Sequence, residues 1–134
     1  MNIKEFAEKF IKAEIEAFQN GNFEPLKAIE DPNVVYHMGH LNRDIIGHEA
    51  HKQDIIDSQQ GVSINKREFQ YLTGEGNLFA LTLKTNGRIT GENPRFPIKM
   101  PVGKNTSGSF LALFRVKNGK VIEGWANGYR TILD

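Results

Sequence analysis

The chain begins with apolar residues spaced three and four positions apart, the period of a helix with one buried face. This pattern runs through residues 3–19 and predicts a first, amphipathic helix. Asn20 and Gly21 should end this helix, because both tolerate a left-handed backbone conformation. Residues 23–29 favour a short second helix, and residues 47–58 predict a third.

Strand patterns account for most of the remaining chain. Asp31-Pro32-Asn33 predicts a turn, and the β-branched and aromatic run after it predicts a strand over residues 34–38. A short bridge after Gly39 leads to the third helix. Asn118-Gly119 predicts a two-residue type I′ hairpin between the last two strands. Residues 86–103 carry three prolines and are expected to be irregular. The other strands are expected at residues 64–72, 78–85, 109–117 and 120–133.

The order of these elements indicates the fold class. Helices fill the first half and strands in a meander fill the second, which is typical of an α+β fold and not of alternating β-α-β units. A sheet of this size must bury one face, and three helices are available to cover it. With 134 residues and no internal repeat or linker, the chain is expected to form a single domain over residues 1–134.

Composition narrows the classes of function. The formal net charge is +1, so no strong field draws the protein to nucleic acid or to an anionic membrane. Cysteine is absent, which excludes disulfides, thiol nucleophiles and thiolate-rich zinc sites. The first residues are charged where a signal peptide is apolar, and no stretch is long enough to span a bilayer. We therefore expect a cytoplasmic protein with no nucleic-acid or membrane partner.

Glu14 interrupts the apolar face of the first predicted helix, four residues after Phe10 and four before Phe18. Burial of a carboxyl among phenylalanines raises its pKa, which is how enzymes obtain a proton carrier near neutral pH. Glu14 is therefore a candidate catalytic residue. The alternatives are a structural pair with an arginine or histidine, or a contact in a dimer.

All four histidines lie between positions 37 and 51, as two H-x-x-H pairs. His37, on the first predicted strand, is a candidate acid or base because imidazole titrates near neutral pH, and His51 is a second candidate facing the interior. For each the alternative is a core residue with one nitrogen satisfied. His48 and His51 share a helix face and could hold a metal ion, but zinc hydrolases space their histidines four apart. We therefore assign no metal ligands.

The last predicted strand has two unlike faces. Glu123, Trp125, Asn127 and Tyr129 alternate onto one face, and small residues form the other. We expect the first set to line a ligand pocket, because its side chains are large and can form hydrogen bonds. Filling of the core by Trp125 and Tyr129 is the alternative. Further lining is expected from other strands, at Tyr36, Phe69, Tyr71, Phe110 and Phe114.

Basic residues gather in the irregular stretch before the last hairpin. Residues 86–104 contain one acidic side chain, Glu92, against Arg88, Arg95, Lys99 and Lys104. The segment could recognise an anion, or it could be a solvated loop, because no glycine-rich phosphate cradle accompanies the charges. Its length and its prolines are consistent with a semi-rigid flap over a pocket or across a partner subunit.

Three segments carry a family resemblance: residues 31–37 (Asp-Pro-Asn-Val-Val-Tyr-His), residues 47–50 (Gly-His-Glu-Ala) and the hairpin of residues 114–125. With the order of elements, they resemble the nuclear transport factor 2-like superfamily and, within it, the SnoaL-like polyketide cyclases. The resemblance spans nearly the whole chain. It implies a cone-shaped α+β barrel, in which a curved antiparallel or mixed sheet and three helices on its concave side enclose a pocket. It also implies that the first helix lines the pocket and that the sheet forms a homodimer.

The resemblance also bears on the reaction. SnoaL-like cyclases typically carry an acidic residue four positions after a tryptophan on the last strand, and here the position counted from Trp125 is Tyr129. A tyrosine can donate a hydrogen bond there but is a poor base near neutral pH. The superfamily includes isomerases, dehydratases, cyclases, hydrolases and proteins without chemistry, so function has to be argued from the site.

The resulting hypothesis is a SnoaL-like protein that binds a small apolar or aromatic metabolite. Proton transfer on it, as isomerisation, dehydration or ring closure, would use Glu14 and His37, with Tyr36, Asn127 and Tyr129 as polarising donors and no cofactor. The main alternative is a non-catalytic homodimeric binding or interaction module. A third reading is a metal-dependent enzyme that uses the histidine cluster.

Overall fold

One six-stranded sheet organises the chain. The structure, a computed structural model, describes residues 1–95 and 99–133. The strand order is β2-β1-β6-β5-β4-β3, with β1 parallel to β6 and every other neighbouring pair antiparallel. The strands are β1 (Glu30–Met38), β2 (Arg43–Ile46), β3 (Val62–Glu75), β4 (Leu78–Ile89), β5 (Asn105–Lys117) and β6 (Lys120–Leu133).

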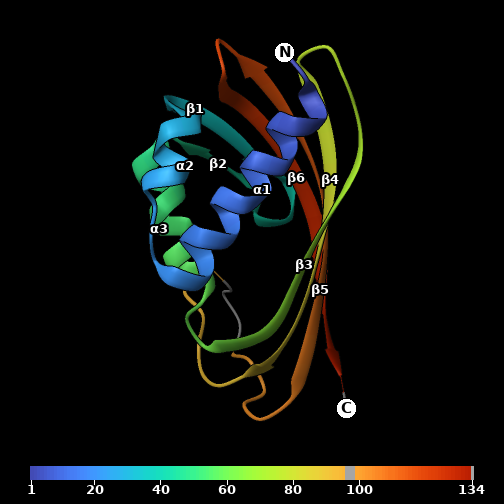
Figure 1. The fold of residues 1–134 in the computed structure, drawn as a ribbon. Helices are drawn as coiled ribbons and strands as arrows, with labels where there is room; N and C mark the ends of the chain where they lie inside the picture. Colours follow the sequence, from blue (N-terminus) through green and yellow to red (C-terminus); the bar gives the residue numbers. More distant parts are fainter. Residues whose placement is uncertain (96–98, 134) are drawn as a thin grey trace.

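The helices all lie on one side of the curved sheet (Figure 1). They are α1 (Ile3–Asn20), α2 (Glu24–Ile29) and α3 (His48–Ser58), with a 3₁₀ turn, η1 (Gly39–Leu41), between β1 and β2. On the opposite, convex face of β3–β6 no helix lies among the described residues (Figure 1). This arrangement confirms the predicted α+β cone. No helix in the described part of the chain is long and apolar enough to cross a membrane.

Local signals set the ends of α1. The side chain of Asn2 accepts a hydrogen bond from the backbone N–H of Glu5 at 3.1 Å, which caps the first turn. Gly21 ends the helix with a φ of 66°, a left-handed conformation that glycine adopts without steric cost. The predicted apolar face is buried, and Glu14 is buried with it.

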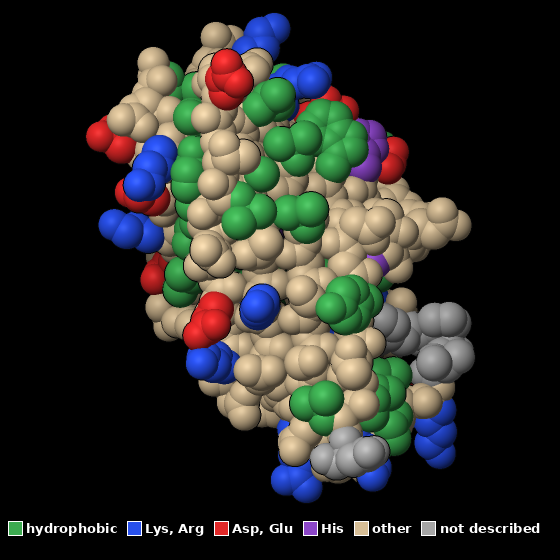
Figure 2. All heavy atoms as spheres, turned by 90° about the vertical axis from the view of Figure 1, so that its right-hand side faces the viewer, with side chains coloured by type: hydrophobic (Ala, Val, Ile, Leu, Met, Phe, Trp, Pro, Cys, Tyr) green, Lys and Arg blue, Asp and Glu red, His purple; other side chains and the backbone are tan. Residues whose placement is uncertain are grey.

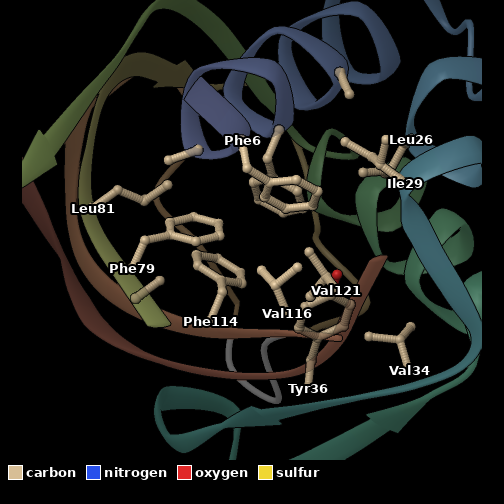
Figure 3. Packing of buried hydrophobic residues seen from close by; sticks show 14 of the residues in the cluster. Phe6, Leu26, Ile29, Val34, Tyr36, Phe79, Leu81, Phe114, Val116 and Val121 are labelled. Carbon is tan, nitrogen blue, oxygen red and sulfur yellow. The ribbon is translucent and has the colours of Figure 1, made fainter. Parts of the chain in front are cut away.

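The core lies between α1 and the concave face of the sheet (Figure 3). Phe10 of α1 packs against Phe114 of β5 with ring centroids 4.7 Å apart, and Phe79 of β4 stacks on Phe114 at 4.9 Å. Aromatic pairs at such separations add to the stabilisation from burial alone. These contacts fix α1 over the centre of the sheet, and Phe114 of β5 points inward.

Three details differ from the sequence-based expectations. The bridge after Gly39 contains a strand, β2, which pairs with β1. The turn expected at Asp31-Pro32-Asn33 lies within β1, where the pairing with β6 shifts register between Glu30 and Val35. β4 continues to Ile89 and thus extends into the stretch expected to be irregular. In each case long-range pairing ordered a segment whose local signals are those of a loop.

Candidate functional site

A cavity of about 160 Å³ lies between the concave face of the sheet and helices α1 and α3. Most of its lining is aromatic or aliphatic, as in small-molecule sites generally. The apolar lining includes Phe10, Phe18, Met38, Ile55, Ile64, Phe69, Leu81, Leu83, Phe110, Ala112, Phe114 and Ala126. The polar lining is Glu14, Tyr36, His40, His51, Asp54, Ser58, Arg67, Thr85, Arg95 and Arg130.

Glu30, the first residue of β1, is 1% exposed and bonds to two residues that border the cavity, Tyr36 and His51. Its Oε1 accepts a hydrogen bond from Nδ1 of His48 at 2.7 Å, and its Oε2 accepts from Nδ1 of His51 at 2.8 Å and from the hydroxyl of Tyr36. Burial, the largest single influence, raises the pKa of Glu30, but the histidine and tyrosine donors together lower it by more. The pKa therefore lies below its usual value, and Glu30 is a carboxylate at neutral pH.

Tyr36 keeps its proton in this arrangement. Burial, and then the charge of Glu30, raise the pKa of the Tyr36 hydroxyl well above its ordinary value. The hydroxyl therefore donates to Glu30 at neutral pH. Its ring packs against that of His51, with centroids 4.4 Å apart. Tyr36 thus helps to fix both partners of the buried His51–Glu30 bond.

His51 lies between two carboxylates. Its Nδ1 bonds to Glu30, while its Nε2 is 3.6 Å from Oε1 of Glu14, which borders the cavity from α1. Burial, the largest single influence, lowers the pKa of His51, but the hydrogen bond and charge of Glu30 and the charges of Glu14 and Asp54 raise it by more. The net pKa is therefore raised from its ordinary value of 6.5, and an imidazole in such surroundings can give and take a proton.

Arg67 of β3 completes the surroundings of Glu14. Its Nη2 lies 3.9 Å from Oε2 of Glu14, and its guanidinium covers the rings of Phe18 at 4.0 Å and Phe69 at 4.7 Å. Burial lowers the pKa of Arg67, although the charge of Glu14 opposes this. Arginine nevertheless stays protonated at any ordinary pH, so Glu14 has a positive charge on one side and His51 on the other.

The sequence-predicted site residues divide into two groups. Those that border the cavity are Glu14, Tyr36, His51, Phe69, Phe110, Phe114 and Trp125. Those that do not are His37, Tyr71, Asn127 and Tyr129. Tyr71 instead packs at the edge of the core, where its hydroxyl approaches Gly74 and its ring lies 6.0 Å from Nζ of Lys4.

His37 lies outside the cavity because side chains alternate along β1, and its neighbour Tyr36 points inward. Its Nδ1 is 2.9 Å from Oδ1 of Asp44, and its Nε2 is 2.8 Å from Oε2 of Glu123. The hydrogen bonds with Glu123 and Asp44 raise the pKa of His37. The structure therefore places an ion-pair cluster where the sequence predicted a pocket histidine.

The face of β6 that points toward the concave side of the sheet is the opposite of the one expected. A Cβ at Gly124 would lie 2.6 Å from the Tyr36 ring, so the face of small residues is the inward one. Next to Gly124, Tyr36 and Phe114 already occupy the concave side and leave no room for a larger side chain. Asn127 and Tyr129 are exposed, Tyr129 at 67%. Trp125 borders the cavity, but its indole packs with His37 at 5.6 Å and with the guanidinium of Arg115 at 5.4 Å.

A second, outer hollow of about 250 Å³ adjoins the cavity. The two share His40, Ser58, Arg95, Phe110 and Arg130, so these residues mark the boundary between them. The outer hollow is completed by Asn93, Met100, Gly128, Tyr129 and Ile132.

Sequence reasoning missed Glu30 as the residue that joins the site together. The signal was indirect: His48 and His51 are three apart on α3, and that spacing does bring both to one shared partner. The partner is a carboxylate that accepts hydrogen bonds from both rings.

Among residues 1–95 and 99–133, no group of three or more histidine, aspartate or glutamate side chains is arranged to hold a metal ion.

The fold agrees with the comparisons to known proteins. The chain belongs to the SnoaL-like polyketide cyclase family, whose family model matches residues 8–128. No curated protein sequence matches the chain.

Solved structures of similar fold cover nearly the whole chain. A protein from Mesorhizobium loti, provisionally designated a SnoaL-like polyketide cyclase, has a TM-score of 0.69 at 20% identity, covering 96% of this chain and 99% of its own. IdmH of Streptomyces antibioticus, provisionally designated a polyketide cyclase, has a TM-score of 0.69 at 20% identity, covering 96% and 92%. A protein from Rhodopseudomonas palustris, provisionally designated an isomerase, has a TM-score of 0.70 at 15% identity, covering 92% and 88%. Identities this low establish the fold and leave the reaction to be argued from the site.

Proposed function

We propose that the protein binds a small, apolar or aromatic carbonyl compound in the cavity and catalyses proton transfer on it, as an isomerase, dehydratase or cyclase. The observation that carries the proposal is the Glu30–His51–Glu14 arrangement, in which a buried carboxylate holds a histidine whose second nitrogen points toward an acid at the cavity. Family membership supports this class of reaction. The lack of cysteine supports the predicted cytoplasmic location.

His51 is the proposed proton carrier, in place of His37. Because Glu30 accepts from Nδ1, the neutral ring carries its free lone pair on Nε2, the nitrogen nearer Glu14. A carboxylate behind a histidine fixes the tautomer and stabilises the imidazolium, as in the triad of serine hydrolases. Nε2 can therefore accept a proton from a substrate carbon or hydroxyl and return it at another position.

Glu14 is the proposed second carrier. It borders the cavity, it lies 3.6 Å from Nε2 of His51, and it is buried with the apolar face of α1. A proton that His51 receives can pass to Glu14, or Glu14 can act on one side of the substrate while His51 acts on another. Tyr36 serves as a positioning residue, since its hydroxyl is bonded to Glu30. No cofactor is needed for such proton transfer.

The size of the cavity sets the choice of a test compound. A cavity of about 150 Å³ accommodates a benzene ring, and the adjoining hollow offers room for a short substituent, so phenylacetone, with one ring and an acidic CH₂ beside a carbonyl, is a suitable probe. In D₂O, ¹H NMR follows the loss of the CH₂ signal as the protein exchanges its protons. We expect His51→Gln and Glu14→Gln to slow the protein-dependent exchange by about 10²- to 10⁴-fold, the usual contribution of a general acid or base.

Two comparisons make this test specific. Glu8→Gln removes a carboxylate from the exposed side of α1 and should leave the exchange rate unchanged. His37→Gln tests the assignment made from sequence: a loss of exchange in this variant, with His51→Gln unaffected, would transfer the role to His37. If the wild-type protein binds aromatic ketones but exchanges the protons of none of them, the proposed activity is refuted.

A homodimer formed through the sheet is a further part of the proposal. The convex face, which no helix of the described residues covers, carries several apolar side chains (Figure 2); Leu111, Leu113 and Tyr129 are exposed, and the half-buried Trp125 is paired with Leu113. Leu111 is 56% exposed, which favours a contact with a second copy of the chain. Sedimentation velocity should give a dimer that dissociates in the Leu111→Lys/Leu113→Lys variant. Ile46→Lys, at an exposed leucine-sized side chain of β2, is the control that should remain dimeric, and a monomeric wild type would exclude the dimer.

A further inference from the structure

The buried polar atoms that lack a partner all surround one space. Among residues 1–95 and 99–133, the buried side-chain nitrogen and oxygen atoms without a hydrogen bond are His40 Nδ1, Arg67 Nη1, Thr85 Oγ1, Arg95 Nε and Arg130 Nε. Every one of these residues borders the cavity. A buried donor without an acceptor costs free energy, so such groups are normally satisfied by protein, water or ligand. Their confinement to one cavity indicates a ligand with strong hydrogen-bond acceptors.

Arg130 is the residue with the least compensation. Nη1 of Arg130 donates to the hydroxyl of Thr106 at 3.3 Å, and no carboxylate pairs with the guanidinium in the described part of the chain. Arg95 pairs with one carboxylate that it shares with another arginine, and the charge of Asp57 also acts on it. Its Nε is 3.5 Å from Oδ1 of Asp54, the same oxygen that accepts from Nη2 of Arg43 at 3.0 Å.

The two arginines also act on each other. Burial lowers the pKa of Arg130, and the positive charge of Arg95 lowers it further. Both guanidinium groups remain protonated at neutral pH. The two half-buried cations repel each other, and Asp54 and the charge of Asp57 oppose only Arg95, so a bound anion would reduce the remaining positive charge.

The position of the arginines separates them from the proposed proton carriers. Arg95 and Arg130 border both the cavity and the outer hollow, whereas Glu14 and His51 border only the cavity. A ligand whose ring occupies the cavity would therefore direct one end toward Glu14 and His51 and another end toward the two arginines.

We propose that Arg95 and Arg130 bind the carboxylate of an aryl-substituted carboxylic acid whose ring occupies the cavity. This proposal depends on the proposed function in one respect: both place the aromatic ring of the ligand in the cavity. The Nε–H edge of Arg130, whose Nε lacks a partner, can bind a planar pair of oxygens. The other lining of the outer hollow, with Met100, Phe110 and Ile132, is largely apolar and suits an acid with a hydrocarbon body.

The test compares an acid with its neutral isostere. 3-Phenylpropionate and 3-phenylpropionamide differ in charge but hardly in shape, and calorimetry or ligand-observed NMR at pH 7 gives the affinity of each. We expect the acid to bind about 10- to 100-fold more tightly, the usual effect of charge-assisted hydrogen bonds. Arg130→Gln should weaken binding of the acid about tenfold or more and change binding of the amide less than twofold. Arg88→Gln, at an exposed arginine of β4, should change neither.

Each other outcome overturns the proposal in a recognisable way. Equal affinity for acid and amide in the wild type would mean that water satisfies the arginines. Competition by inorganic phosphate at the affinity of the acid would mean an unspecific anion site. If the wild type prefers the acid and Arg130→Gln binds the acid equally well, the carboxylate binds somewhere other than at Arg130. Phenylacetone has no carboxylate, so its exchange rate does not depend on these results. Failure of this proposal can therefore be told apart from failure of the proposed activity.

Discussion

Nδ1 of His51 lies 2.8 Å from Oε2 of Glu30, and this bond connects α3 to the first residue of β1. The two residues are 21 positions apart, and both are buried. The carboxylate holds the ring in one orientation and leaves Nε2 for the cavity side. The same bond therefore contributes to the stability of the fold and to the proposed chemistry.

The first prediction concerns the pH dependence of stability. The pKa of Glu30 is lowered from its ordinary value of 4.5, so its contribution is present above pH 4.5 and is lost as the pH falls through the folded-state pKa. The pKa of His51 is raised from 6.5, so its contribution is present below pH 6.5 and is lost as the pH rises through the folded-state pKa. Urea unfolding from pH 3 to 9 should show the greatest stability between about pH 4.5 and 6.5.

Glu30→Gln tests the source of that dependence. The free energy of unfolding at pH 6 should fall by about 3–5 kcal/mol, because the charged partner of His51 is removed from a buried pair. The decline on the acid side should become shallower. Glu8→Gln, at an exposed carboxylate, should change stability by less than about 0.5 kcal/mol. An unchanged pH profile in Glu30→Gln would show that other groups determine it.

The second prediction concerns the order in which the histidines titrate. The hydrogen bonds to Glu123 and Asp44 raise the pKa of His37, and the surroundings of His51 raise its pKa as well. Burial and the charge of Arg95 lower the pKa of His40. A ¹⁵N-labelled imidazole titration followed by NMR should therefore find His37 and His51 protonated at pH 6.5 and His40 neutral. A pKa for His40 above that of His37 would contradict the described surroundings of both rings.

The third prediction is that Arg130→Met stabilises the protein without ligand. Methionine keeps much of the aliphatic volume of arginine and removes a half-buried charge that has no carboxylate partner in the described structure, so we expect a gain of about 1 kcal/mol. Urea unfolding at pH 7 measures it, with Arg88→Met as the exposed control. A loss of more than about 1 kcal/mol would instead assign Arg130 a structural role, such as an ion pair formed in solution.

Much of the fold was predictable because its signals are local. The apolar period of α1, its cap at Gly21 and the Asn118-Gly119 hairpin each depend on neighbouring residues, and each is present in the structure. Glu14 was noticed for the same reason, since it breaks a regular pattern. β2 was missed because four residues with a mixed pattern carry too little signal, and its pairing with β1 decides its structure.

The site was less predictable because it depends on long-range contacts. Alternation along β6 correctly divides its residues into two sets, but alternation alone does not say which set faces inward. The choice depends on Tyr36 and Phe114, which already occupy the concave side next to Gly124. Likewise Glu30 and His51 meet only after α3 packs over β1, and no local pattern links the two positions.

The last prediction uses this close packing at Gly124. A Cβ there would lie 2.6 Å from Cδ1 of Tyr36 and 3.0 Å from Cδ1 of Phe114, so Gly124→Ala must displace the ring of Tyr36. Overpacking of this kind usually costs about 1–3 kcal/mol, and movement of Tyr36 also removes its hydrogen bond to Glu30. We expect Gly124→Ala to lower both the midpoint of urea unfolding and the rate of phenylacetone exchange.

Gly91→Ala is the matched control for this substitution, because the atom nearest to a Cβ at Gly91 is 3.9 Å away. It should leave stability within about 0.5 kcal/mol and the exchange rate unchanged. If Gly124→Ala loses stability but keeps full exchange, the Tyr36 hydroxyl is not needed to position Glu30 and His51. If it loses exchange at full stability, the position of Tyr36 controls the proton carriers directly, and Tyr36→Phe should reproduce the loss without any added volume.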